Sequence, residues 1–389
     1  MPLLSLLVSV FLSFLVVGIA LPVLPLHVHD GLGQGTFMVG LVTGSQFAAA
    51  LATRMWAGNH ADTKGAKRAV VVGLLAASAG GWLYLLSLQF VHAPELSSAI
   101  LLVGRTVLGG GESFIITGAL GWGVALAGAE GTGKVMSWMG TAMYAAFAAG
   151  APIGTALYGS QGFTAVAVAT AVAPLVTLLL VARLAPVAPR AGVRPSFLKV
   201  LSSVWVPGTA LALSSLGFGA ITAFVALLFA ARGWSPGWPA FTAFAGCFML
   251  ARIFLGASVD RLGGTRVALV SVILEAAGLV LVWSADDATL AVAGAALTGL
   301  GYSLVYPGLG VEAVRRSPPE SRALAMGAYT ACLDLALGVG TPALGLVAGR
   351  RELGDVFLVS AVVVSCSAFI ILHVMCRTSP SSQLGGPTA

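Results

Sequence analysis

Long apolar runs alternate with short breaks of charged residues, proline or glycine along almost the whole chain. A helix that crosses a bilayer needs about 20 mostly apolar residues, because its backbone polar groups must be satisfied within the segment. The pattern therefore predicts twelve membrane-spanning helices, near residues 3–27, 38–57, 69–90, 97–126, 135–159, 162–182, 204–231, 238–257, 266–284, 288–311, 323–348 and 354–376. Little of the chain remains for a water-soluble domain.

The composition also indicates a membrane protein. The 389-residue chain is 58% hydrophobic and 9% charged, with a mean hydropathy of +0.97, whereas soluble domains carry about 25% charged residues. We therefore expect an all-α integral membrane fold. Cys247, Cys332, Cys366 and Cys376 all fall inside or at the end of apolar runs, without the paired spacing of a metal site or a disulfide framework. We expect neither a bound metal nor another cofactor.

The basic residues predict how the chain is oriented. With the N-terminus inside, 16 of the 20 lysines and arginines fall in segments that would be cytoplasmic. Such an excess is the rule for cytoplasmic loops of membrane proteins. The sequence pI of about 9.4 thus indicates membrane orientation and not a nucleic-acid partner. We expect a monomer in the lipid bilayer of a bacterial cytoplasmic (inner) membrane, multi-pass, with both termini cytoplasmic.

Two halves of the chain repeat each other. The segments "RMWAGNHADTKGAKR" and "RIFLGASVDRLGGTR" share five identities at a constant spacing of 198 residues. The matched pairs are Arg54 and Arg252, Gly58 and Gly256, Asp62 and Asp260, Gly65 and Gly263, and Arg68 and Arg266. Farther along, Gly150 and Pro152 match Gly340 and Pro342 at a spacing of 190. The repeat predicts a six-helix unit used twice in the same orientation, with a substrate path between the two copies.

The repeat also predicts the domain organisation. We expect an N-terminal six-helix bundle at residues 1–182 and a C-terminal six-helix bundle at 204–376. Between them, residues 183–203 contain the proline-rich, basic stretch "RLAPVAPRAGVRPSFLK", which is typical of a linker and is expected to be cytoplasmic. Residues 377–389 form the expected cytoplasmic tail.

Several motifs resemble those of the major facilitator superfamily. "GNHADTKGAKR" resembles the superfamily's loop between helices 2 and 3, "RTVLGGGES" its fourth-helix motif, and "GAPIG" the fifth-helix motif of its exporters. The wider combination, including "GIALPVLPLHV" and "GGGESFIITGALGWG", resembles the YhhS/YfcJ-type, arabinose-efflux-like branch. The resemblance implies two six-helix bundles that rock about a central site. It also implies that Asp62 clamps the halves together near the start of helix 11 when the cavity faces outward.

The expected gating residues have a physical basis. They are Gly58, Asp62, Gly65, Arg68, Gly256, Asp260, Gly263, Arg266, Gly150, Pro152 and Gly154. Gly58 and Asp62 share a helix face, and Gly65 can supply the positive φ of a tight turn. Pro152 removes a helix hydrogen bond, and the glycines beside it let a neighbouring backbone come close. Two alternatives stay open: the basic residues only set the orientation, with Asp62 as their local counter-ion, and the proline–glycine stretch only packs helices.

Helix 4 carries two charges in its apolar middle, Arg105 and Glu112. A charge at the bilayer centre costs about 2.5–3.5 kcal/mol on insertion scales, so it persists when it is paired, faces a cavity or is functional. A separation of seven residues places both on one side of the helix, about 10 Å apart. Burial favours a neutral carboxyl group, whereas a nearby arginine favours the charged form. We expect Glu112 to exchange a proton, with Arg105 tuning it or binding an anionic substrate; a purely structural ion pair is the alternative.

Other polar positions complete the expected site. Asp334 in helix 11 matches Tyr144 of helix 5 at the spacing of 190 and is a second candidate for the proton. Glu275 lies in helix 9, which is peripheral in the superfamily, so we expect a structural role. His27, at the outer end of helix 1, is expected to be a solvated surface residue. The residues expected to line the cavity are Gln46, Ser113, Tyr144, Ser214, Ser215, Thr222, Tyr302, Ser303 and Tyr306.

Together these features predict a secondary active transporter and not an enzyme. We expect a proton-coupled exporter, an antiporter of a small organic solute driven by the proton gradient. The chain has no phosphate loop of the form G-x-x-x-x-G-K-[ST], so ATP-driven transport is unsupported. The intramembrane charges supply neither a nucleophile with its base nor a metal cluster. A lipid-handling flippase or a proton symporter of the same fold is the alternative, because a fold does not fix a function.

Overall fold

The computed structural model describes residues 2–128, 132–187, 197–317 and 322–378, and every regular element in these ranges is a helix. The elements are α1 (Pro2–Ala20), α2 (Leu24–Leu26), the π-helix η1 (His27–Gly31), α3 (Thr36–Lys64), α4 (Ala66–Ser87), the 3-10 helix η2 (Leu88–Phe90), α5 (Pro94–Ala127), α6 (Thr132–Gln161), α7 (Phe163–Ala182), α8 (Phe197–Ala231), α9 (Trp238–Leu255), α10 (Ser258–Leu262), α11 (Gly264–Trp283), α12 (Ala288–Arg315), α13 (Arg322–Arg350) and α14 (Asp355–Thr378).

The lengths of these helices fit a membrane. Over the described ranges, eleven segments are long and apolar enough to cross one. The remaining long helix, α6, has 30 residues and packs along α1. The predicted all-α membrane fold with twelve long helices is therefore confirmed.

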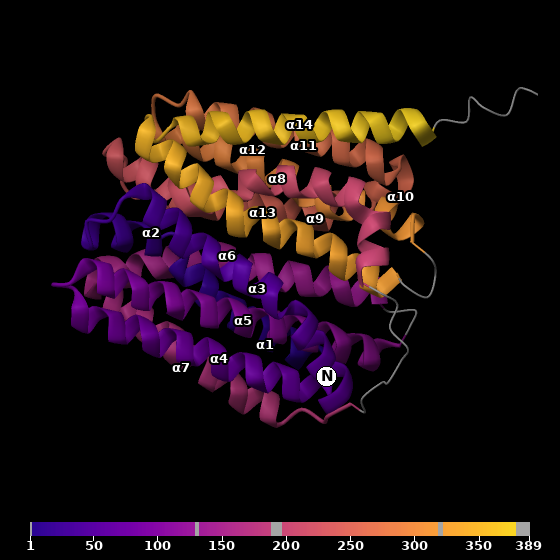
Figure 1. The fold of residues 1–389 in the computed structure, drawn as a ribbon, viewed down its shortest axis with the longest axis horizontal. Helices are drawn as coiled ribbons and strands as arrows, with labels where there is room; N and C mark the ends of the chain where they lie inside the picture. The colour runs from indigo at the N-terminus through magenta and orange to yellow at the C-terminus, as the bar shows by residue number, and fades with distance from the viewer. Residues whose placement is uncertain (1, 129–131, 188–196, 318–321, 379–389) are drawn as a thin grey trace, which may run out of the picture.

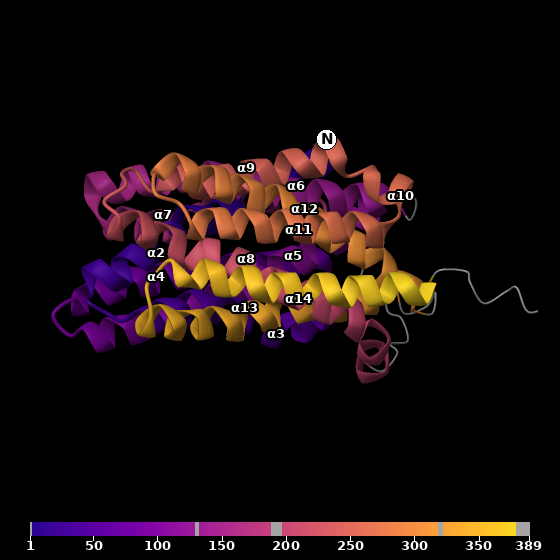
Figure 2. The same cartoon turned by 90° about the horizontal axis from the view of Figure 1, so that it is seen from above.

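The helices form two groups that follow the order of the chain. Figure 1 shows α1 to α7, in indigo to magenta, in the lower part and α8 to α14 above them, and in Figure 2 the long helices again run side by side. Between the groups, α3 packs against α13 and α6 packs against α9. The chain starts at the same end of the molecule at which α7 ends and α8 begins (Figure 1). We call this end the linker end.

The segment between the groups is shorter than the sequence predicts. Helix α7 ends at Ala182 as expected, but α8 begins at Phe197, so residues 197–203 of the predicted linker are helical. Residues 188–196 of the linker and 379–389 of the predicted tail lie outside the described residues.

Glycines with positive φ connect helices at the repeated loops. Gly65 has a φ of +100° between α3 and α4, and Gly263 has a φ of +90° between α10 and α11. Residues with a Cβ rarely adopt this conformation. The positive φ expected at Gly65 is observed, and its repeat counterpart shares it.

The two groups touch closely at the end opposite the linker end. Helices α3 and α13 approach so closely that a methyl group on Gly40 would lie 2.5 Å from the Thr341 carbonyl oxygen. In the same region, the Thr36 hydroxyl donates a hydrogen bond of 2.8 Å to the carbonyl of Gly345. These contacts close the space between the halves at this end.

Helix α5 reaches its neighbours through a run of three glycines. A methyl group on Gly109 would lie 2.1 Å from the carbonyl oxygen of Gln46 in α3. A methyl group on Gly111 would lie 2.7 Å from the carbonyl oxygen of Gly73 in α4. The glycines thus accommodate neighbouring helices, which fixes α5 against α3 and α4.

This packing predicts that Gly109→Ala destabilises the protein. The added methyl group meets backbone atoms that cannot move aside cheaply, and overpacking of this kind costs about 1–3 kcal/mol. We expect a lower thermal midpoint for the detergent-purified variant. Gly121→Ala is the matched control, because that position on the same helix has open space around it. Equal midpoints for the two variants would contradict the predicted packing.

Candidate functional site

A cavity of about 800 Å³ lies between the two groups of helices. Its walls come from α1, α3, α5 and α6 on one side and from α8, α9, α12 and α13 on the other. The lining extends from Leu21 and Leu337 to Met136, Asp260 and Val314, the last three being near the linker end. Because α3 and α13 close the opposite end, the cavity opens toward the linker end.

Aromatic rings form much of the cavity wall. The rings of Tyr144 and Phe248 are stacked with their centroids 3.5 Å apart, which brings α6 and α9 together. Phe218 and Tyr302 form a second stacked pair at 5.7 Å, and Phe248 lies 5.9 Å from Tyr302. A mostly apolar wall with a few polar groups is typical of binding sites for small organic molecules.

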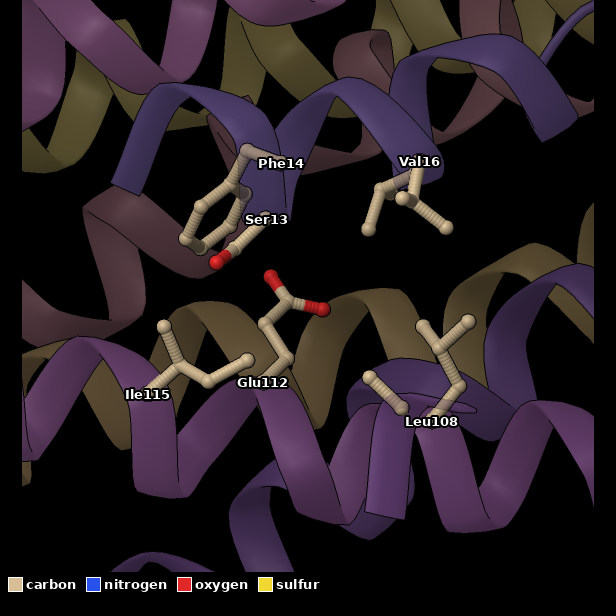
Figure 3. A pocket seen from close by; sticks show the side chains of 8 residues that line it. Ser13, Phe14, Val16, Leu108, Glu112 and Ile115 are labelled. Atoms are coloured by element: carbon tan, nitrogen blue, oxygen red, sulfur yellow. The ribbon is translucent and has the colours of Figure 1, made fainter. Parts of the chain in front are cut away.

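Glu112 lies between this cavity and a second, much smaller one. Its Oε2 accepts a hydrogen bond from the Gln46 side-chain amide of α3. Figure 3 shows the carboxyl group extending from α5 toward Ser13 and Phe14 of α1. The smaller cavity has a volume of about 10 Å³, close to the lower limit for one water molecule. Glu112 therefore has a neutral hydrogen-bond partner and space beside it for a proton carrier.

Arg105 makes its contact with a different helix. Its side chain is fully buried, and Nη1 donates a hydrogen bond of 3.4 Å to the Tyr84 hydroxyl of α4. Arg105 is not among the cavity-lining residues, and in the described part of the chain no hydrogen bond or ion pair joins it to Glu112. Although both residues lie on α5, Arg105 contacts α4 and Glu112 contacts α3. The two residues thus form no direct ion pair, and an influence of the Arg105 charge on Glu112 over a longer distance stays a prediction.

Asp334 forms an ion pair that joins the two halves. Its Oδ2 contacts Nη2 of Arg54, so α13 is linked to α3 at the cavity wall. The exposed fraction of the Asp334 side chain is 6%, and that of Arg54 is 23%. The sequence pointed to Asp334 but assigned Arg54 only to membrane orientation and to the repeat. The arginine that compensates an intramembrane carboxylate is therefore Arg54 and not Arg105.

Arg252, the repeat counterpart of Arg54, lines the same cavity from α9. Its Cζ lies 5.8 Å from the ring centroid of Phe248, and the guanidinium also lies beside Gly140 of α6. Across the described residues, no carboxylate lies within ion-pair distance of it. The cavity thus contains one arginine with a counter-ion and one without, and sequence analysis had not placed either arginine there.

The residues expected to line the cavity divide into two groups. Those that do line it are Gln46, Ser113, Tyr144, Tyr302 and Tyr306. Those that the structure instead buries in helix packing are Ser214, Ser215, Thr222 and Ser303. Serine and threonine hydroxyls commonly bond backbone carbonyls or neighbouring helices, so polarity alone did not separate the two groups.

The hydrogen bonds of the buried hydroxyls explain this correction. Ser214 donates to Glu275 of α11, which is itself fully buried and outside the cavity lining, in agreement with the structural role expected for that glutamate. Ser303 donates a bond of 2.7 Å to the Phe248 carbonyl. Ser215 lies 3.2 Å from the Tyr302 hydroxyl, and Thr222 bonds its own helix backbone.

His27 also departs from expectation. It is 6% exposed, and its ring stacks on Phe163 of α7 with the centroids 4.0 Å apart. The expectation of a solvated surface histidine is therefore wrong. The reason is that further helical segments, α2 and the π-helix η1, follow α1 and bring the His27 ring into contact with α7.

The residues of the repeated loops lie at the linker end. Asp62 and Arg68 are exposed on either side of Gly65, and Asp260 and Arg266 are exposed on either side of Gly263. Gly58 and Gly256 lie a turn earlier, within and directly after α3 and α9. The side chains at the start of α13, residues 322–324, lie outside the description, so the latch between Asp62 and helix 11 stays a prediction.

Lys67 has a contact that membrane orientation alone does not explain. Its Nζ donates hydrogen bonds of 2.8 Å and 2.6 Å to the carbonyls of Ala182 and Leu184 at the end of α7. A cation at the C-terminus of a helix compensates its unpaired carbonyls. Lys67 therefore fixes the start of α4 to the end of α7, the last helix of the first half.

The proline–glycine stretch of α6 packs closely against α1. A methyl group on Gly150 would lie 2.6 Å from the carbonyl carbon of Gly18, and one on Gly154 would lie 2.0 Å from the carbonyl oxygen of Ile19. Pro152 is inside the continuous helix α6. The close backbone approach expected here is present, and a role in gating stays a prediction.

Comparison with known proteins identifies relatives over the whole chain. The family model of the Major Facilitator Superfamily (MFS) matches residues 6–240 and 209–388. A protein of Salmonella typhimurium, described as an uncharacterized MFS-type transporter, is 42% identical over 369 residues, which cover 95% of this chain and 95% of that protein. The assignment to a particular branch stays a prediction.

Solved structures share the fold. A D-xylose-proton symporter superposes with a TM-score of 0.76 at 13% sequence identity, covering 95% of this chain and 96% of that one. The nucleoside transporter NupG superposes with a TM-score of 0.73 at 16% identity, covering 96% of this chain and 99% of that one. At these identities the likeness concerns the fold.

The ion pair between the halves predicts coupled effects on stability. Arg54→Gln or Asp334→Asn leaves the other charge without its partner, which costs about 3–5 kcal/mol in fully buried pairs and less here, because Arg54 is partly exposed. We expect both variants to lower the thermal midpoint, and the double variant to recover part of the loss.

Arg315→Gln is the control for this double-mutant cycle. Arg315 pairs with Glu312 of its own helix, and its side chain is 59% exposed, so its loss is expected to change stability by less than about 1 kcal/mol. Losses at Arg54 and Asp334 that simply add in the double variant would contradict the pair.

Proposed function

The chain belongs to the Major Facilitator Superfamily and is a multi-pass membrane transporter, and we propose that it couples movement of a small organic solute through the central cavity to proton exchange at Glu112. The position of Glu112 carries this proposal. It is a cavity-lining carboxyl group whose described hydrogen-bond partner is a neutral amide. Such a group can take up a proton without breaking an ion pair, which Asp334 cannot do.

A coupling site must also exchange its proton with only one side at a time. In this structure the cavity around Glu112 opens toward the linker end, while contacts between α3 and α13 close the other end. Rocking of the two halves about this site would reverse the access of Glu112. The small cavity beside Ser13 offers a position for a water molecule that relays the proton.

We further propose that the linker end faces the cytoplasm of a bacterium and that the protein lies in the inner membrane. The excess of basic residues in the segments at the linker end supports this orientation, even without Arg54 and Arg252, which line the cavity. The cavity is then open to the cytoplasm, ready to receive an intracellular solute.

Exchange is the proposed form of coupling: a proton enters as the solute leaves. It is supported by the resemblance of "GAPIG" to the fifth-helix motif of exporters. Cotransport is the second candidate, and the uncompensated charge of Arg252 favours it. An anion bound at Arg252 would repel an ionised Glu112, so proton and anion would be taken up together.

Proton flux in proteoliposomes tests this function. With a pH dye inside, we expect a gradient of the transported solute, found from a panel of sugars, amines and carboxylates, to drive a proton flux in the wild type. In Glu112→Gln this flux should fall to the background of protein-free liposomes, because an amide cannot exchange the proton. Solute–solute exchange, which needs no proton transfer, should persist. The sign of the pH change distinguishes exchange from cotransport.

Glu275→Gln is the matched control, since it removes a second buried glutamate that lies outside the cavity. It should retain the solute-driven proton flux. Uphill transport that survives in Glu112→Gln would contradict the proposal and direct attention to Asp334. Loss of flux in both variants would show a general effect of removing a buried carboxyl group.

A further inference from the structure

We propose that Arg252 binds an anionic group of the transported solute, and that the solute class is therefore an organic anion with an apolar or aromatic body. This inference rests on the proposed function, because it takes the central cavity as the transport site. It comes from a difference between the two repeats at positions that are otherwise equivalent.

The two halves meet at two interfaces that the repeat relates to each other. Helix α3 of the first half packs on α13 of the second, and α9 of the second half packs on α6 of the first. Arg54 of α3 corresponds to Arg252 of α9 at a spacing of 198 residues. Asp334 of α13 corresponds to Tyr144 of α6 at a spacing of 190. Each interface therefore brings an arginine toward the same partner position.

The partner position differs in charge between the two interfaces. At the first, Asp334 supplies a carboxylate and pairs with Arg54. At the second, Tyr144 stands in its place and stacks on Phe248, one turn before Arg252. The guanidinium lies beside Phe248 and Gly140, without the carboxylate that its counterpart has. The second interface has the cation of the ion pair but not the anion.

The other carboxylates of the cavity do not fill this role. Glu112 accepts its hydrogen bond from Gln46, and Asp334 is paired with Arg54. Asp260 lies in α10 at the linker end, exposed at the opening of the cavity. A cation in the apolar part of a membrane protein is costly without a partner. A solute carboxylate or phosphonate can supply the missing charge, and the guanidinium can bind its two oxygens at once.

The walls around Arg252 indicate the rest of the solute. Tyr144, Phe248, Tyr302 and Phe218 form a continuous series of neighbouring rings on the same cavity. Such rings favour an apolar or planar body next to the anionic group. The volume of about 800 Å³ lies in the usual range of about 300–1,000 Å³ for small-molecule sites.

Binding of a matched pair of probes tests this assignment. Naphthoate carries an anionic group on an aromatic body, and naphthamide has nearly the same shape without the charge. By isothermal titration calorimetry on the detergent-purified protein, we expect naphthoate to bind and naphthamide to bind about tenfold more weakly or not at all. Arg252→Gln should weaken naphthoate by a similar factor, and Arg252→Lys should have an intermediate effect. Arg351→Gln, at an exposed arginine of the opposite end, should bind like the wild type.

Tyr144→Asp is the sharper variant, because it installs the carboxylate that the first interface has. Its carboxylate should pair with Arg252, so Tyr144→Asp should bind naphthoate more weakly than Tyr144→Asn, which removes the same ring without adding a charge. Loss of the ring affects both variants, so the difference between them reports the occupation of Arg252. Equal binding of naphthoate by the two variants would contradict the anion site.

The outcomes also separate this inference from proton coupling. Equal binding of both probes, naphthoate binding that survives Arg252→Gln, or no binding of naphthoate to the wild type would each overturn the anion site. If the anion binds through Arg252 but drives no proton flux, the anion site stands and the proposed coupling fails. If a neutral solute drives a flux that depends on Glu112, coupling stands and the anion site fails.

Discussion

A charge in the apolar interior of a membrane protein needs a partner, and this constraint explains how the polar groups of the transporter are arranged. Each intramembrane charge meets it differently. Arg54 and Asp334 neutralise each other across the two halves. Arg105 and Glu275 are fully buried and contact hydroxyl groups of neighbouring helices. Glu112, with its amide partner, and Arg252 line the cavity with no opposite charge among the described residues within ion-pair distance, and these two carry the proposed chemistry.

The internal repeat explains why the two halves meet at two similar interfaces. Two similar halves produce two similar interfaces, so a solute that passes between them meets equivalent backbones on both sides. Side chains then make the interfaces different. An ion pair holds α3 to α13, whereas stacked aromatic rings and a free guanidinium connect α6 and α9. The first interface is suited to holding the halves together, and the second is suited to binding a solute that completes it.

The fold could be predicted from the sequence, because a helix that crosses a membrane must pair its own backbone groups and therefore appears as an apolar run of about 20 residues. The sequence pointed to Glu112 and Asp334 as residues of the cavity, because carboxylates within the apolar runs are few. It did not predict that Arg105 contacts α4 while Glu112 contacts α3, because residues on one helix face can still contact different neighbours. It missed Arg54 and Arg252 at the cavity, because basic residues near loops also set orientation. Ser214 and Ser303 looked like cavity residues, but a hydroxyl group can be satisfied within helix packing.

The central claim is that Glu112 exchanges a proton with the solvent through the cavity. Infrared spectroscopy of the protein in lipid tests it most directly, because a protonated carboxyl group has a C=O band distinct from those of carboxylates and amides. We predict that the difference between the wild-type and Glu112→Gln spectra contains a carboxyl band that disappears as the pH is raised, and that Glu275→Gln retains this band. A difference spectrum of the folded proteins without a carboxyl band that changes with pH would contradict the claim.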